Sequence, residues 1–103
     1  MTESEYAQLT DAFFKRLDQA LEAADIDYEL APGGILEMEF DDGSKIVINR
    51  QPAMQEIWVA AKSGGFHYRW QDGAWRDTRS GEELFASLEK MASQQAGEPV
   101  SLA

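Results

Sequence analysis

The sequence predicts an α+β two-layer sandwich, in which an N-terminal and a C-terminal helix pack on one face of a five- to six-stranded antiparallel sheet. Apolar residues recur at helical spacing near both ends of the chain, and short runs that alternate apolar and polar residues fill the middle. Because short turns join these runs, neighbouring strands should be antiparallel. Two amphipathic helices can cover only one face of such a sheet, so its other face is expected in water. A chain of 103 residues is enough for one domain, residues 1–103, and too short for two.

The first helix is expected over residues 3–24, where apolar residues recur every three or four positions and form one stripe. The stripe consists of Tyr6, Leu9, Phe13, Leu17, Leu21 and Ala24. A second row with the same spacing consists of Asp11, Lys15, Asp18, Glu22 and Asp25. The helix should therefore bury one face and present a largely acidic row to solvent.

Strands are expected over residues 26–30, 35–40, 44–49, 56–61, 66–70 and 74–77. Strong turn signals at Asp42-Gly43 and Asp72-Gly73 separate two pairs of them. Period-two alternation turns Ile57 and Val59 to the core and Glu56, Trp58 and Ala60 to the open face. By the same rule His67 and Arg69 share the face of Trp58, whereas Phe66, Tyr68 and Trp70 are expected in the core.

The second helix should begin at residues 80–83, where Ser80 and Glu83 have the spacing of a capping box. Its apolar face consists of Leu84, Phe85, Leu88, Met91 and Ala92. Gly97 should end the helix, and Pro99 prevents it from resuming. The last residues, 97–103, are expected to be loosely held or to lie along the helices.

The net charge of −10 is confined to the first part of the chain. Residues 1–42 hold 12 acidic and two basic side chains, whereas residues 43–103 hold seven of each. Nucleic-acid binding depends on Lys and Arg that neutralise phosphates, so this composition argues against a nucleic-acid partner. The negative electrostatic field of residues 1–42 should attract cations and basic protein surfaces instead.

The absence of cysteine excludes disulfides, thiolate metal sites and cysteine nucleophiles formed by this chain. A single histidine argues against a Ser–His–Asp triad, and no convergent acidic pair of helices suggests an oxidase centre, so we expect no enzyme. No apolar run approaches the roughly 20 residues of a membrane helix, so no membrane partner is expected. The N-terminus lacks the basic and then apolar stretch of a signal peptide, and a cytoplasmic location follows as an expectation.

The acidic row has two interpretations. A helix face can be polar simply because water covers it. However, the nearby basic residues that usually offset like-charge repulsion are almost missing. Because this repulsion costs stability, it indicates that the acidic row has a function. Carboxylates are hard oxygen ligands for Mg, Ca, Mn and iron, and on an exposed surface they should bind such ions weakly and at several sites.

The open sheet face also has two interpretations. Trp58 is either a binding hot spot or a ring that packs beside its own neighbours. Asn49, Arg50 and Gln51 precede Pro52 and form either a polar recognition patch or a turn whose side chains cap backbone groups.

Several motifs together resemble the bacterial frataxins, the CyaY family. They are the GSKIVINRQ run at residues 43–51, the IWVA strand at 57–60, GGFHY at 64–68 and the ending SGEELF…LEKMASQQAGEPVS at 80–101. The likeness also includes the helix–sheet–helix order and the acidic first helix and strand, and it covers nearly the whole chain.

The resemblance implies a cytoplasmic protein of iron–sulfur cluster assembly that binds iron weakly on an acidic ridge. It also implies docking on the cysteine desulfurase and its scaffold protein, as an iron donor or as a regulator. By position, the metal ligands are Asp11, Asp18, Glu22, Asp25, Asp27 and Glu29, and the docking residues are Asn49, Arg50, Gln51 and Trp58. Fe²⁺ or Fe³⁺ is the expected ion, other divalent cations can substitute, and the chain should be a monomer without metal. Lys15, Gln19, Ala23 and Ala24 depart from the acidic pattern of the family and bear on how many iron ions bind.

The alternative class is a metal-independent acidic interaction protein, which inhibits a partner by mimicking nucleic acid. Replacement of Trp58 separates the two hypotheses, because a purely electrostatic mimic does not need the indole.

Overall fold

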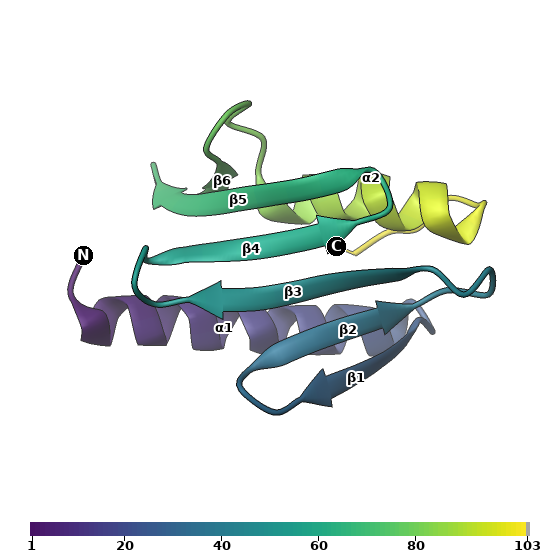
Figure 1. Ribbon diagram of the computed structural model, residues 1–103, viewed down its shortest axis with the longest axis horizontal. Coiled ribbons are helices and arrows are strands. Elements are labelled where there is room, and N and C mark those ends of the chain that lie inside the picture. Colours follow the sequence, from purple (N-terminus) through teal and green to yellow (C-terminus); the bar gives the residue numbers. More distant parts are fainter. Residues whose placement is uncertain (103) are drawn as a thin grey trace.

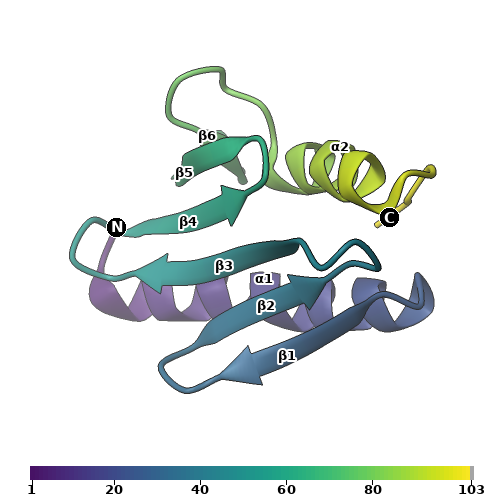
Figure 2. The same cartoon turned by 45° about the vertical axis from the view of Figure 1, so that its right-hand side comes forward.

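The computed structural model describes residues 1–102 and confirms the α+β sandwich, with six strands in one sheet. The elements are α1 (Glu3–Ala23), β1 (Asp27–Ala31), β2 (Ile35–Glu39), β3 (Lys45–Gln51), β4 (Glu56–Ala61), β5 (Gly64–Gln71), β6 (Ala74–Asp77) and α2 (Leu84–Ala96). The strands are antiparallel and lie in chain order from β1 to β6. Both helices pack behind the sheet, and its other face is open to the viewer (Figures 1 and 2).

α1 begins at a capping box that sequence reasoning overlooked. The Thr2 hydroxyl accepts a hydrogen bond from the Glu5 amide, and the Glu5 carboxylate accepts one from the Thr2 amide. The helix ends without glycine, because Asp25 takes the left-handed conformation (φ 58°) that turns the chain into β1.

β3 ends two residues later than predicted, and this changes the positions of Arg50 and Gln51. The strand runs to Gln51, so Asn49, Arg50 and Gln51 lie within it and point alternately to opposite faces. Gly43 (φ 83°) and Gly73 (φ 78°) form the two predicted hairpin turns.

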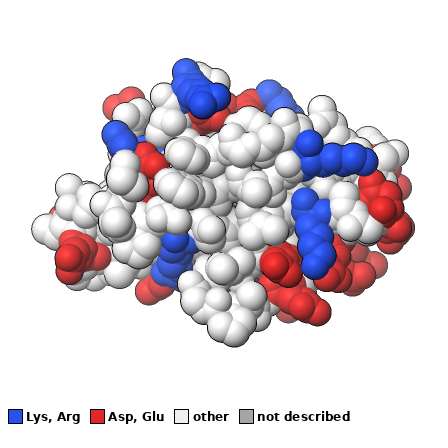
Figure 3. Space-filling view, viewed as in Figure 1, with Lys and Arg blue, Asp and Glu red and all other residues white. Residues whose placement is uncertain are grey.

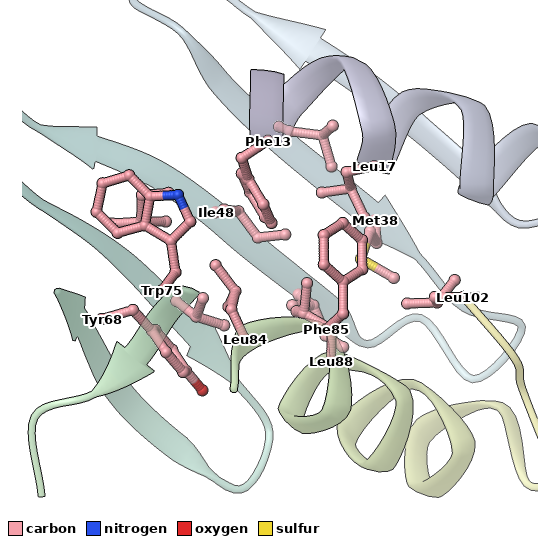
Figure 4. Close-up of a cluster of buried hydrophobic side chains, with 14 of the residues drawn as sticks. Phe13, Leu17, Met38, Ile48, Tyr68, Trp75, Leu84, Phe85, Leu88 and Leu102 are labelled. Carbon is pink, nitrogen blue, oxygen red and sulfur yellow. The ribbon is translucent and has the colours of Figure 1, made fainter. Parts of the chain in front are cut away.

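The core lies between the helices and the covered face of the sheet (Figure 4). Phe13 and Leu17, which belong to the predicted apolar stripe of α1, meet Met38 and Ile48 of the sheet there. The prediction for β5 was partly wrong, because only Tyr68 is fully buried. Phe66 and Trp70 lie near the sheet edge beside the short β6 and are half-buried.

The start predicted for α2 was also wrong. Glu83, not Ser80, caps the helix, and its carboxylate accepts hydrogen bonds from the Phe85 and Ala86 amides. Ser80 instead belongs to the preceding turn, where its hydroxyl accepts from the Glu82 amide.

The tail after α2 returns along that helix. The Leu102 side chain is buried in the core, and the Leu102 amide donates to the Glu89 carboxylate at 2.8 Å. Neither helix within residues 1–102 has the length and apolar character needed to cross a bilayer.

Candidate functional site

Charged side chains are unevenly spread over the open side of the molecule (Figure 3). Acidic groups gather toward β1 and β2, whereas the middle of the sheet carries mostly uncharged side chains. We use the name acidic ridge for the six predicted metal ligands Asp11, Asp18, Glu22, Asp25, Asp27 and Glu29. We use the name docking face for the open-face residues around Trp58.

One part of the acidic ridge is formed where α1 meets β1. The Tyr28 hydroxyl donates hydrogen bonds to Asp18 and, at 3.3 Å, to Glu22. The bond to Asp18, together with partial burial and the two negative charges, raises the pKa of Tyr28 well above its usual value. The phenol thus holds two carboxylates together near the end of a helix whose last turn contains no basic residue. Negative charge at a helix C-terminus is unfavourable, so this end of α1 should attract cations.

A second part of the ridge lies on the open face of β1 and β2. Asp27 pairs across the strands with Glu39, and Glu29 pairs with Glu37. Like charges directly opposite each other destabilise a sheet. Glu37 and Glu39 were not among the predicted ligands, although both lie in the alternating run at residues 35–40.

Among residues 1–102, one basic side chain pairs with this second part. Lys45 lies 3.6 Å from Glu37 and 3.8 Å from Glu39. A single ammonium leaves most of the negative charge of the four strand carboxylates uncompensated.

Asp11 stands apart from the other ridge residues. Its carboxylate accepts a hydrogen bond from the Arg50 guanidinium at 2.6 Å, so it already has a cationic partner. Within residues 1–102, no three acidic or histidine side chains converge into a preformed metal site. The ridge is therefore a field of mostly exposed carboxylates and not a closed coordination shell.

The docking face is built from residues that lie opposite one another on three strands. Trp58 of β4 lies between Asn49 of β3 and His67 of β5. The indole stacks on the imidazole with ring centroids 4.2 Å apart and an interplanar angle of 6°. In the next row, Glu56 lies between Gln51 and Arg69.

Arg50 is not brought together with the other three predicted docking residues. Because it lies between Asn49 and Gln51 on a strand, its side chain turns to the helix side. Its guanidinium donates to the Thr10 hydroxyl at 2.9 Å and lies 4.7 Å from the centre of the Phe14 ring.

Sequence reasoning treated Glu56 as a solvent-facing residue, and the structure gives it a different position. Its side chain is on the open face but only 3 % exposed. It accepts hydrogen bonds from Trp58 Nε1 at 2.9 Å and from Arg69 at 2.6 Å, and it lies 3.7 Å from His67 Nδ1. Burial raises its pKa, but the two hydrogen bonds and the neighbouring positive charge outweigh burial and hold the pKa of Glu56 below its usual value.

Tyr6 anchors α1 to the end of the docking face. Its hydroxyl donates to the Glu56 carbonyl at 2.7 Å and accepts from the Gln51 amide at 3.0 Å. One helix side chain therefore bridges β3 and β4 beside the Glu56 row.

Comparison with known proteins gives one consistent result. A family model described as a frataxin-like domain matches residues 1–98. A protein of Dechloromonas aromatica named iron–sulfur cluster assembly protein CyaY is 55 % identical over 104 residues, which cover 99 % of each chain. A protein of the same name from Paraburkholderia phymatum is 51 % identical and covers 100 % of this chain and 99 % of its own.

Solved structures give the same result. A frataxin from Psychromonas ingrahamii has a TM-score of 0.89 at 32 % identity, covering 100 % of this chain and 99 % of its own. The trimeric frataxin of Saccharomyces cerevisiae complexed with ferrous iron has a TM-score of 0.67 at 27 % identity, covering 95 % of this chain and 88 % of its own.

Proposed function

Because this chain belongs to the frataxin-like family, we propose that it is a non-enzymatic protein of iron–sulfur cluster assembly. In this proposal the acidic ridge carries iron weakly, and the docking face binds the cysteine desulfurase and its scaffold protein. The protein acts as an iron donor or as a regulator of the assembly rate. The observation that supports this most is the proximity of two unlike surfaces, an acidic ridge with few basic partners and a sheet face of mostly uncharged side chains. Trp58 lies on that sheet face, between Asn49 and His67.

Iron is the cargo of the ridge in this proposal. Asp18 and Glu22 form one attachment point, and the strand carboxylates Asp27 and Glu29 form another. Carboxylate oxygens suit Fe²⁺ and Fe³⁺ as well as Mg²⁺ and Mn²⁺, so selectivity should be poor. Exposed ligands leave the ion partly hydrated, which keeps binding weak.

Docking combines steering and contact. The ridge attracts a basic groove on the partner, and the indole of Trp58 supplies the central contact. Asn49 and Gln51 flank it on β3, and we place Arg50 at the margin because its guanidinium lies on the helix side beside Asp11. Since iron and the partner use the same carboxylates, saturating Fe²⁺ should change the affinity for the desulfurase at constant ionic strength.

A two-dimensional NMR titration of labelled protein tests both surfaces. Anaerobic Fe²⁺ should broaden resonances near residues 18–29, and an Asp18→Asn, Glu22→Gln variant should reduce that broadening. Asp72→Asn is the matched control, because it removes one carboxylate in the β5–β6 turn at the opposite edge of the sheet. The desulfurase, added separately, should shift resonances of the ridge and of residues 49–58. No effect of iron and no effect of desulfurase would contradict the proposal.

The second candidate is the metal-independent acidic interaction protein. It is favoured by the lack of a convergent ligand set within residues 1–102. Trp58→Ala separates the two, because it should strongly weaken docking on the desulfurase but scarcely weaken a purely electrostatic mimic. Loss of desulfurase binding in Trp58→Ala, together with iron broadening at the ridge, excludes the mimic.

A further inference from the structure

We propose that Glu56 is a positioning residue of the docking face, whose buried carboxylate turns the Trp58 indole N–H inward so that a partner meets carbon atoms of the ring. This inference rests on the proposed docking function only for the identity of the partner. The orientation of the indole is a property of the free protein and is tested without a partner.

The position of Glu56 is unusual for a carboxylate. Period-two alternation puts it on the open face with Trp58, yet it is 3 % exposed whereas the side chains of His67 and Arg69 are 49 % and 50 % exposed. The acid therefore lies beneath the more exposed side chains of its neighbouring strand.

Both carboxylate oxygens are occupied. Oε1 accepts from Trp58 Nε1 at 2.9 Å and lies 3.7 Å from His67 Nδ1. Oε2 accepts from Arg69 Nη2 at 2.6 Å. On the β3 side the row continues with Gln51, which carries no charge.

Buried carboxylates are costly unless hydrogen-bond donors surround them. If the indole rotated outward, Glu56 would lose one of two hydrogen bonds and remain a buried charge. Stacking on His67 opposes the same rotation, since the two rings lie 6° from parallel at 4.2 Å. The indole is thus held at its N–H by an acceptor and at its ring by a stacked partner.

This arrangement determines the chemistry available to a partner. The indole N–H is already used within the chain, so the contact must come from exposed ring carbons against an aliphatic or aromatic side chain. A ring that is fixed before binding also loses less conformational entropy on association.

The first test observes the indole N–H of Trp58 in ¹⁵N-labelled protein, assigned by its loss in Trp58→Phe. We expect slow exchange with solvent and a chemical shift that follows protonation of Glu56 as the pH is lowered. Glu56→Gln should remove that titration, whereas the matched control Asp72→Asn should keep it. Free exchange of the N–H, or a spectrum unchanged in Glu56→Gln, would overturn the inference whatever the partner is.

The second test measures binding of the cysteine desulfurase. Trp58→Ala should weaken binding about 30-fold, as for a central aromatic hot spot. Trp58→Phe should weaken it only about threefold, because phenylalanine keeps an apolar aromatic ring although it is smaller than the indole and lacks the N–H.

The affinity of Glu56→Gln for the desulfurase should lie between those of the wild type and Glu56→Ala, because glutamine keeps an acceptor for the indole. Equal losses in Trp58→Phe and Trp58→Ala would overturn the ring-contact part. If the wild-type protein does not bind the desulfurase, the proposed function fails, and the exchange measurement alone decides the role of Glu56.

Discussion

The acidic ridge and the docking face use the same chemical group in opposite ways. Asp18 and Glu22 share one phenol near the end of α1, whose last turn contains no basic residue. Glu56 is a single carboxylate that receives an indole N–H and a guanidinium. The ridge therefore keeps unsatisfied charge that an external cation can use, whereas the charge of Glu56 is fully used within the fold. Location in the fold, not residue type, separates a binding carboxylate from a structural one.

The largest expected difference between the two regions is in stability. Glu56→Ala should lower the free energy of unfolding by about 2–3 kcal/mol, because it leaves the Trp58 N–H and the Arg69 guanidinium without their partner. Asp18→Asn, in contrast, should be neutral or slightly stabilising because it relieves repulsion. Urea denaturation of the two variants measures both effects. Equal destabilisation by the two variants would contradict the distinction between the internally paired carboxylate of Glu56 and the carboxylates of the acidic ridge.

The pH dependence of this difference follows from the lowered pKa of Glu56. Its folded-state pKa lies below the ordinary value of 4.5, so its contribution to stability is present above that pH and is lost as the pH falls through the lowered value. The gap in unfolding free energy between wild type and Glu56→Gln should therefore be constant near neutral pH and close in acid. Denaturation at a series of pH values checks this. A gap that widened in acid would mean that Glu56 is better accommodated when protonated.

Salt and divalent cations should act on the ridge. Either should raise the melting temperature of the wild-type protein, by about 2–4 °C for a stabilisation of about 0.5 kcal/mol. Asp18→Asn combined with Glu22→Gln should reduce the gain from Mg²⁺ or Mn²⁺ more than Asp72→Asn does. Thermal scans with and without the ions measure this. No rise in the wild type would show that the acidic residues are already compensated in the fold.

The smallest expected effect concerns Tyr28. Its phenol must release Asp18 and Glu22 before a cation can use all their oxygens. Tyr28→Phe should therefore bind Mn²⁺ about twofold more tightly, since roughly half a kilocalorie of hydrogen bonding is no longer displaced. Paramagnetic relaxation of water protons at increasing Mn²⁺ concentration measures this. Weaker binding by Tyr28→Phe would mean that the phenol instead holds the carboxylates in a useful arrangement.

Much of the fold could be predicted from the sequence because its signals are local. The apolar stripe of residues 3–24, the turn glycines and the alternation around Ile57 and Val59 are repeats that neighbouring residues reveal. The positions of the predicted docking residues were harder to predict. The strand of residues 44–49 was expected to end two residues early, so alternation was not applied to Arg50, which lies on the helix side.

The sequence by itself determined the order of the helices and strands, the confinement of negative charge to residues 1–42 and the outward direction of Trp58. Only the tertiary structure decided the pairing of Asp27 with Glu39, the use of Asp11 by Arg50 and the burial of Glu56 beneath its neighbours. The physical reason is the separation along the chain of the residues that set each feature. Periodicity is set by backbone geometry within a few residues, whereas cross-strand register and burial depend on which distant side chains the packed core brings together.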